Sequence, residues 1–133
     1  MRRILLAAAI LVAPLTLAAA PSATAQPVYI DHVQWAKWGD LSSLRVYPTA
    51  AGRQAARQGA TIAQADQAWT EVLAASPDAD IAGMREQFEC HWQWAELAQP
   101  GKTSWNLEPW RPEVDATTMM ASGCNPGGTE EPF

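Results

Sequence analysis

The chain has 133 residues, with 9 Lys and Arg against 14 Asp and Glu, seven Trp and two Cys. Its formal net charge of −5 argues against nucleic acid and anionic lipid as partners, because both attract positively charged surfaces. The length suits one small domain, and the sequence contains neither an internal repeat nor an inter-domain linker.

The first 25 residues predict a secretory signal peptide. Arg2 and Arg3 precede an apolar run over residues 4–17, and small residues follow as far as Ala25. This order of charged, apolar and small residues is typical of such a peptide, and the apolar run is shorter than the ~20 residues that span a bilayer. We expect cleavage after Ala25, which leaves one secreted domain, residues 26–133, without a membrane span. We place it outside the cell or in the cell envelope.

The remaining chain opens with a predicted β-hairpin. The alternation of side chains favours a strand over residues 28–38, Gly39 and Asp40 suit a turn, and a second strand over residues 43–47 ends before Pro48. Two strands alone are marginally stable in water. We therefore expect helices to pack against this hairpin.

Two helices are predicted next. Thr49 can cap a helix that runs to about Gln58. Thr61 and Gln64 form the pattern of a capping box, and the helix after it stops at residues 76–77. This second helix carries one apolar stripe, formed by Ile62, Ala65, Trp69, Val72 and Leu73.

Residues 84–98 are predicted to form the central helix, with Asp80 as its N-cap. At about 100° per residue, the polar side chains gather in one narrow sector. That sector contains Arg85, Glu86, Glu89, Gln93 and Glu96. The rest of the surface is an apolar arc of about 220°, more than twice the stripe of an ordinary surface helix. We expect the helix to be covered on two sides, with Trp92 and Trp94 both in the arc.

The last part of the chain reads as an extended segment and a short helix. Pro109 and Pro112 exclude a central strand, so residues 102–112 should run along the surface with Trp105 and Leu107 directed inward. After it, Asp115 can cap a helix through Met119 and Met120, and a loose tail is expected from about residue 125. The fold class is therefore α+β: an antiparallel β-hairpin, open to a third extended strand, packed against three to four helices.

The two cysteines, Cys90 and Cys124, predict one disulfide in an exported chain. It would close a loop of 34 residues, and the chain-entropy model gives such a loop roughly 3–4 kcal/mol of stability. The rival interpretation is a nucleophilic thiol at Cys90 beside His91. Adjacent residues of a helix point about 100° apart, which is not a catalytic geometry.

Five stretches of the sequence resemble a family of small secreted actinobacterial proteins that is classed as a domain of unknown function. They are residues 33–39, 43–49, 83–92, 102–112 and 123–127. The resemblance covers most of the chain after residue 25. It implies export and a single domain, and it implies no activity.

His91 is the first candidate for chemistry. It lies near the middle of the predicted apolar arc, with Gln87 one turn earlier, and a buried imidazole needs a hydrogen-bond partner. One interpretation is a structural pair, tied to each other or to the backbone of residues 105–112. The other is a general base or ligand contact oriented by a carboxylate, Glu108 or Asp31. No motif for zinc or another metal is present, and no cofactor is predicted.

Trp105, Trp110 and Arg111 form the second candidate, a binding platform. Tryptophan rings beside an arginine can hold a sugar ring or a peptide that carries a carboxylate. The alternative is that both rings cap the core while Arg111 stacks on one ring and pairs with an acidic residue on the surface.

Two classes of function follow from these residues. The first is a non-catalytic binding or structural module, which binds a cell-envelope component or a protein through a Trp-lined surface beside residues 105–112. The second is a small secreted hydrolase or antibacterial toxin that uses His91 with Glu108 or Asp31. A pocket that joins His91 to a carboxylate would favour the enzyme, whereas a sealed His91 would favour the binding module.

Overall fold

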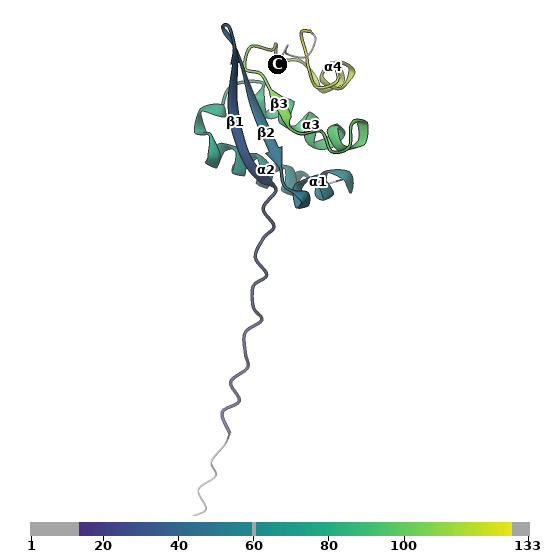
Figure 1. Cartoon of the computed structure of the whole chain (residues 1–133). Helices are drawn as coiled ribbons and strands as arrows, with labels where there is room; N and C mark the ends of the chain where they lie inside the picture. Colours follow the sequence, from purple (N-terminus) through teal and green to yellow (C-terminus); the bar gives the residue numbers. More distant parts are fainter. Residues whose placement is uncertain (1–13, 60, 129–133) are drawn as a thin grey trace, which may run out of the picture.

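The computed structural model describes residues 14–59 and 61–128. Its three strands form one antiparallel sheet in the order of the chain, and helices pack against this sheet (Figure 1). The elements are β1 (Ile30–Trp38), β2 (Leu41–Pro48), α1 (Ala50–Arg57), α2 (Ile62–Ala75), the short helix η1 (Pro77–Ala79), α3 (Met84–Ala98), β3 (Trp105–Leu107) and α4 (Ala116–Ala121). The predicted α+β class is confirmed, and the extended segment supplies the third strand.

The hairpin of β1 and β2 has the predicted turn. Gly39 has a φ of +57°, and type II′ hairpin turns place glycine at this first central position. The register runs from Trp38 opposite Leu41 to a shift between Ile30 and His32. Such a β-bulge leaves one extra residue on β1, so the alternation that we predicted for this end of the strand is wrong.

The domain begins immediately before β1. Residues 14–29 contain no helix or strand, and residues 14–26 extend away from the domain in Figure 1. The Glu71 carboxylate of α2 accepts hydrogen bonds from the backbone N–H groups of Tyr29 and Ile30, both at 2.8 Å. The Gln67 side chain donates to the carbonyl of Pro27 at 2.7 Å. These bonds fix the start of the sheet on α2.

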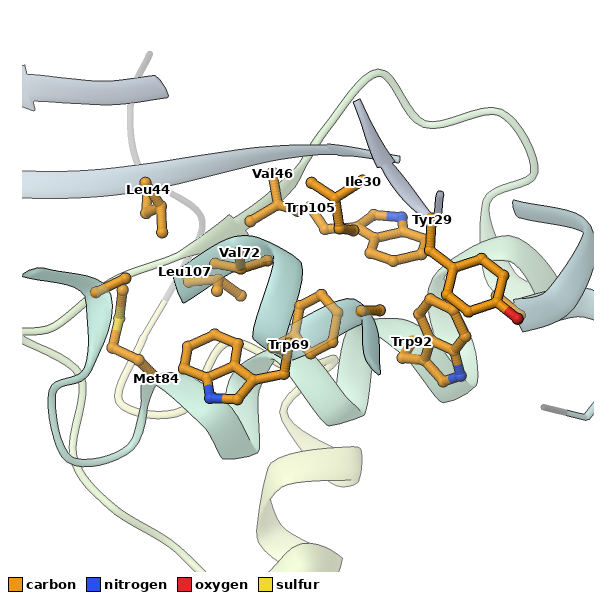
Figure 2. Packing of buried hydrophobic residues seen from close by; sticks show 14 of the residues in the cluster. Tyr29, Ile30, Leu44, Val46, Trp69, Val72, Met84, Trp92, Trp105 and Leu107 are labelled. Atoms are coloured by element: carbon orange, nitrogen blue, oxygen red, sulfur yellow. The ribbon is translucent and has the colours of Figure 1, made fainter. Parts of the chain in front are cut away.

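The hydrophobic core lies between the sheet and the helices. Figure 2 shows Leu44 and Val46 of β2 on one side of it, with Trp69 and Trp92 of the helices on the other. Trp105 of β3 is fully buried, and its ring meets that of Trp92 edge to face at 6.0 Å. Rings of this size bury about 150–250 Å² each, and edge-to-face contact adds to that burial. The predicted inward direction of Trp105 is therefore confirmed.

The helix caps follow the sequence signals, with one exception. Thr49, the Thr61–Gln64 capping box and Asp115 cap α1, α2 and α4 as predicted. Asp80 does not cap α3: it ends η1, and Gly83 precedes α3 with a φ of +85°. A left-handed turn at Gly83 starts α3 without a side-chain cap, which is why the acidic signal at Asp80 misled the prediction.

Helix α3 is buried as predicted over its first half and differs over its second half. Arg85 and Glu86 are exposed, whereas Phe88 and Trp92 are buried. Three placements in this half are wrong: Glu96 is buried at 2 % exposure, whereas Trp94 and Leu97 of the apolar arc are 42 % and 59 % exposed. Glu96 is covered because α1 packs beside it.

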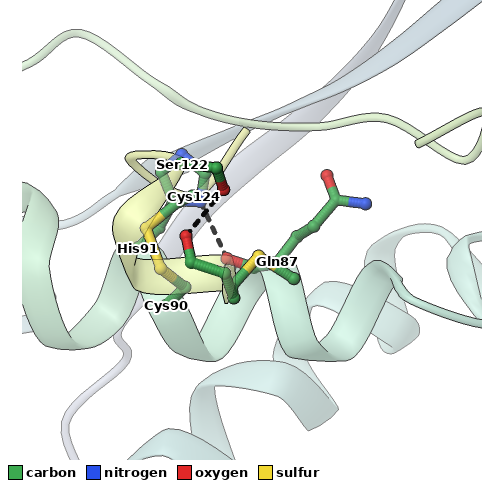
Figure 3. Close-up of a disulfide and its surroundings, with 6 residues drawn as sticks. Gln87, Cys90, His91, Ser122 and Cys124 are labelled. Carbon is green, nitrogen blue, oxygen red and sulfur yellow. Dashed lines mark hydrogen bonds between the residues drawn. A yellow bond between two sulfur atoms is a disulfide. The ribbon is translucent and has the colours of Figure 1, made fainter. Parts of the chain in front are cut away.

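The disulfide between Cys90 and Cys124 is confirmed, with the two Cα atoms 5.6 Å apart. Gly123 and Cys124 both have positive φ, and this pair of left-handed residues returns the chain from α4 to α3. Figure 3 shows Cys124 bonded to Cys90 of α3 at this point. The predicted loose tail from residue 125 is wrong at its start. Pro126 is fully buried, and its carbonyl accepts a hydrogen bond from Arg111, whereas residues 129–133 lie outside the described part.

Candidate functional site

Glu108 lies at the centre of a buried polar network behind β3. Its carboxylate accepts hydrogen bonds from Arg111 Nε at 2.7 Å and from the Ser43 hydroxyl at 2.8 Å. The Glu108 and Arg111 side chains are both fully buried. A buried ion pair is tolerated when hydrogen bonds satisfy both charges, and removal of one partner is costly. The network ties β2 to the segment after β3, which is a structural role.

Gln87 joins this network to α3. Its amide donates to the carbonyl of Glu108 and accepts from the backbone N–H of Glu108, both at 2.9 Å. These two bonds satisfy a buried amide and hold residue 108 against the helix.

His91 is 4 % exposed, and its Nδ1 lies 2.8 Å from the carbonyl oxygen of Gln87 (Figure 3). Because a carbonyl only accepts hydrogen bonds, this contact places a proton on Nδ1. This geometry is compatible with the structural interpretation: His91 contacts the backbone carbonyl of Gln87, and the Gln87 side chain bonds to the backbone of the segment that follows β3.

Asp31, the other predicted orienting carboxylate, is paired elsewhere. It is exposed, and its carboxylate lies 2.5 Å from Nδ1 of its neighbour His32. Adjacent residues of a regular strand point to opposite faces, and the bulge between Ile30 and His32 removes that constraint. The prediction that Asp31 orients His91 is wrong, because Asp31 bonds to His32.

The predicted platform of Trp105, Trp110 and Arg111 does not form a common surface. Trp105 is in the core, and the side chain of Arg111 is fully buried against Glu108. Trp110 is 36 % exposed, donates to the carbonyl of Ser42 and has the Arg111 guanidinium 4.5 Å from its ring centroid. The alternative that we considered from the sequence holds for Trp105 in the core and for Arg111 stacked on a ring. It fails in two respects: Trp110 is exposed and lies outside the core cluster, and the acidic partner of Arg111 is buried.

A groove opens instead between the second half of α3 and the segment after α4. Its volume is about 310 Å³, and His91 and Cys124 are among its lining residues. The other walls are mostly apolar, with Lys102 and Gln99 as the polar groups at the C-terminal end of α3. The described residues that line this groove include neither Asp nor Glu.

Three apolar side chains stand in solvent here: Trp94 and Met120 line this groove, and Leu97 lines a neighbouring groove together with Trp94. Trp94 is 42 % exposed, Leu97 59 % and Met120 51 %. We call these three residues, together with Ala98, the Trp94 surface. Trp94 also lines two neighbouring grooves, of about 170 and 330 Å³. A ring at the meeting point of three grooves is placed for contact with another molecule.

The sequence did not reveal this surface because periodicity reports only which residues are apolar. Helix α4 has six residues, Ala116–Ala121, and its segment meets α3 at Cys90. No described element covers Trp94 to the degree that the arc predicted, so the apolar side chain of Trp94 reaches solvent. The excess width of the arc was the signal that could have indicated a binding face.

Within the described residues, no three His, Cys, Asp or Glu side chains lie together as metal ligands would. The same residues contain no helix with the length and apolar character needed to cross a bilayer.

The fold and the Trp94 surface define a small disulfide-linked α+β domain with an apolar groove beside its central helix. The chain belongs to the family described as "Protein of unknown function (DUF2599)", whose family model matches residues 30–127.

Relatives of this chain occur in mycobacteria. The uncharacterized protein Rv0477 of Mycobacterium tuberculosis (strain ATCC 25618 / H37Rv) is 64 % identical over 107 residues, which cover 80 % of this chain and 72 % of the relative. The uncharacterized protein ML2452 of Mycobacterium leprae is 50 % identical over 102 residues, 77 % of this chain and 82 % of the relative. No solved structure matches the chain. The predicted resemblance to an actinobacterial family of unknown function is therefore confirmed.

Proposed function

We propose that this protein is an exported, non-catalytic binding module that binds a protein of the cell envelope through the Trp94 surface. Two observations support export. The first fixed contact of the domain is at Pro27, two residues after the predicted cleavage at Ala25. The chain also has a disulfide, and such bonds persist in oxidising compartments outside the cytoplasm.

The observation that carries the binding role is the exposure of Trp94 at the junction of three grooves. Tryptophan is enriched among the residues that contribute most to protein–protein binding, where its ring fills a desolvated contact. Met120 stands on the other side of the groove, and the flexible thioether of methionine adapts to partners of different shape. The Trp94 surface thus replaces the surface beside residues 105–112 that we predicted from the sequence.

The chemistry of the groove favours a protein over a sugar as the partner. A sugar site needs several hydrogen-bonding side chains around an aromatic ring. Beside Trp94 this groove has Ala95, Ala98 and Met120, and its polar side chains, His91, Gln99 and Lys102, are the minority of its lining. Apolar walls suit an aliphatic or aromatic side chain. The acidic net charge of −5 also disfavours an anionic envelope polymer.

The hydrolase or toxin alternative has less support. Of the two carboxylates that it would use, Asp31 bonds to His32, and the Glu108 carboxylate receives hydrogen bonds from Ser43 and Arg111. The role of His91 as a general base stays a prediction.

The test uses the immobilised exported protein to capture envelope and culture-filtrate proteins of the bacterium that produces it. We compare the wild type with Trp94→Ala and with Trp38→Ala, a matched control, because Trp38 is also exposed, at 55 %, but does not line these grooves. We expect Trp94→Ala to lose a partner that the wild type and Trp38→Ala retain, with unchanged thermal unfolding of both variants. Equal capture by all three proteins would contradict the proposal.

A further inference from the structure

Strand β1 forms one edge of the sheet, and among the described residues it pairs with β2 alone. At nine residues it is the longest strand of the sheet. An open edge of this length presents a row of backbone N–H and C=O groups that can pair with another strand. Helix α2 packs on β1, whereas α3, which carries the Trp94 surface, packs on β3. The free edge at β1 is therefore the edge of the sheet opposite to the one beside α3.

The register of the hairpin defines which residues direct backbone groups to the free edge. Trp38 and Leu41 flank the two-residue turn, and the i to i+3 hydrogen bond of such a turn makes them a hydrogen-bonded pair. Alternate residues of an antiparallel pair direct their backbone groups away from the partner. Counted from Trp38, the outward residues are therefore Lys37, Trp35 and Val33.

The sequence of β1 is complementary to itself in one antiparallel register. When Gln34 lies opposite Gln34 of a second copy, Val33 lies opposite Trp35, and Asp31 lies opposite Lys37. Val33 and Trp35, which are both outward residues, then meet each other, as an edge-to-edge ladder requires. Asp31 lies at the bulge, next to the last pair of this ladder. A two-fold axis gives each of these pairings twice.

Lys37 supplies the charge argument for a second copy as the occupant. It is exposed, and within the described residues it has no hydrogen bond or ion pair. A lysine on an edge strand ordinarily prevents pairing with other strands. In this register it would face Asp31 of the other copy. That carboxylate is exposed and already contacts His32 of its own chain, so Lys37 would be a second, oppositely charged partner, which is favourable across a ladder.

We propose that β1 pairs with β1 of a second copy of this chain, so that two three-stranded sheets join into one continuous six-stranded sheet. The dimer would leave the Trp94 surface of each copy accessible. The protein would then present two copies of its binding groove.

Sedimentation velocity of the exported protein over a range of concentrations tests this proposal. We expect a concentration-dependent dimer for the wild type. Lys37→Asp places two carboxylates opposite each other across the dimer, and Asp31→Lys places two ammonium groups there, so each variant alone should dimerise at least about tenfold more weakly. An equimolar mixture of the two variants restores an opposite-charge pair at both positions, and it should form a heterodimer at the wild-type concentration.

Two control variants make the same changes of charge away from the edge. Asp80→Lys and Lys102→Asp should dimerise as the wild type does, and thermal unfolding should show that all variants are folded. A wild type that stays monomeric over the whole concentration range would overturn the proposal. Failure of the mixture to restore the dimer, or equal weakening by the controls, would overturn it as well. These outcomes do not depend on partner capture by Trp94.

Discussion

Glu96 is almost completely buried because two arginines of α1 hold its carboxylate. Arg53 Nη1 lies 2.5 Å from one carboxylate oxygen and Arg57 Nη1 lies 2.8 Å from the other, while the Glu96 side chain is only 1 % exposed. Arg53 and Arg57 are four residues apart and so share one face of α1. This contact fixes the position of α1 on α3.

Substitution of Glu96 by Ala should therefore destabilise the protein strongly. The sequence placed Glu96 in the exposed polar sector of α3, where such a substitution would cost little. Loss of one partner of a buried ion pair leaves the other charge without compensation, and we expect a loss of about 3 kcal/mol in the free energy of unfolding. The matched control is Arg57→Ala. That side chain is 47 % exposed, and its removal should cost no more than about 1 kcal/mol. Urea unfolding measures both values, and equal small losses would contradict the structural role of Glu96.

Gly52 illustrates a second constraint at the scale of single residues. It lies inside α1, where alanine is ordinarily about 1 kcal/mol more favourable than glycine. A Cβ at this position would come within 2.2 Å of the backbone oxygen of Tyr29. We expect Gly52→Ala to destabilise the protein by about 1–3 kcal/mol, because the helix or the start of β1 must move. An increase in the melting temperature would show that the contact is looser than described.

At the scale of elements, local sequence signals predicted where the helices begin and end better than they predicted which side chains of a helix are buried. The caps at Thr49, Thr61 and Asp115 depend on residues a few positions apart, and all three are confirmed. The exposure of Trp94 and the burial of Glu96 depend on which distant segment covers α3. Periodicity contains no information on the length of α4 or on the arginines of α1, so the sequence could not predict this part of the helix.

The cap of α4 should make this element sensitive to acid. The backbone N–H of Thr118 donates to the Asp115 carboxylate at 2.7 Å, and this bond lowers the pKa of Asp115 below its ordinary value. A carboxyl whose pKa is lower in the folded state stabilises the fold above its unfolded pKa of about 3.9. That stabilisation disappears as the pH falls through the lower, folded value.

Asp115→Asn is the matched variant, because asparagine caps helices about as well but does not titrate. Hydrogen exchange of the α4 amides at pH 6 and below pH 3 measures the effect. We expect the wild type to lose protection in acid relative to Asp115→Asn, after correction for the intrinsic exchange rates. The same pH dependence in both proteins would contradict the role of the Asp115 charge.

At the scale of the whole molecule, the topology followed from the sequence and the candidate site did not. The hairpin and the Cys90–Cys124 disulfide were predicted correctly. The third strand, which the sequence left open, forms through Trp105 and Leu107, and this segment is buried and does not run along the surface as predicted. The hairpin and the disulfide each have a local signature, such as turn residues, alternation or a pair of cysteines. The surface predicted at Trp105, Trp110 and Arg111 was wrong because aromatic and arginine residues serve a core and a binding site equally well. The chain's tertiary contacts decide between these roles.

Oxidative footprinting of the tryptophans tests the account most directly, because it measures both the architecture and the binding surface. In the free protein we expect rapid oxidation of Trp38, Trp94 and Trp110 and protection of Trp69, Trp92 and Trp105. When an envelope extract of the producing bacterium is added, Trp94 should become protected, whereas Trp38 and Trp110 should stay reactive. Oxidation of Trp92 and Trp105 as fast as Trp94, or unchanged reactivity of Trp94 while Trp38 or Trp110 is shielded, would contradict the account.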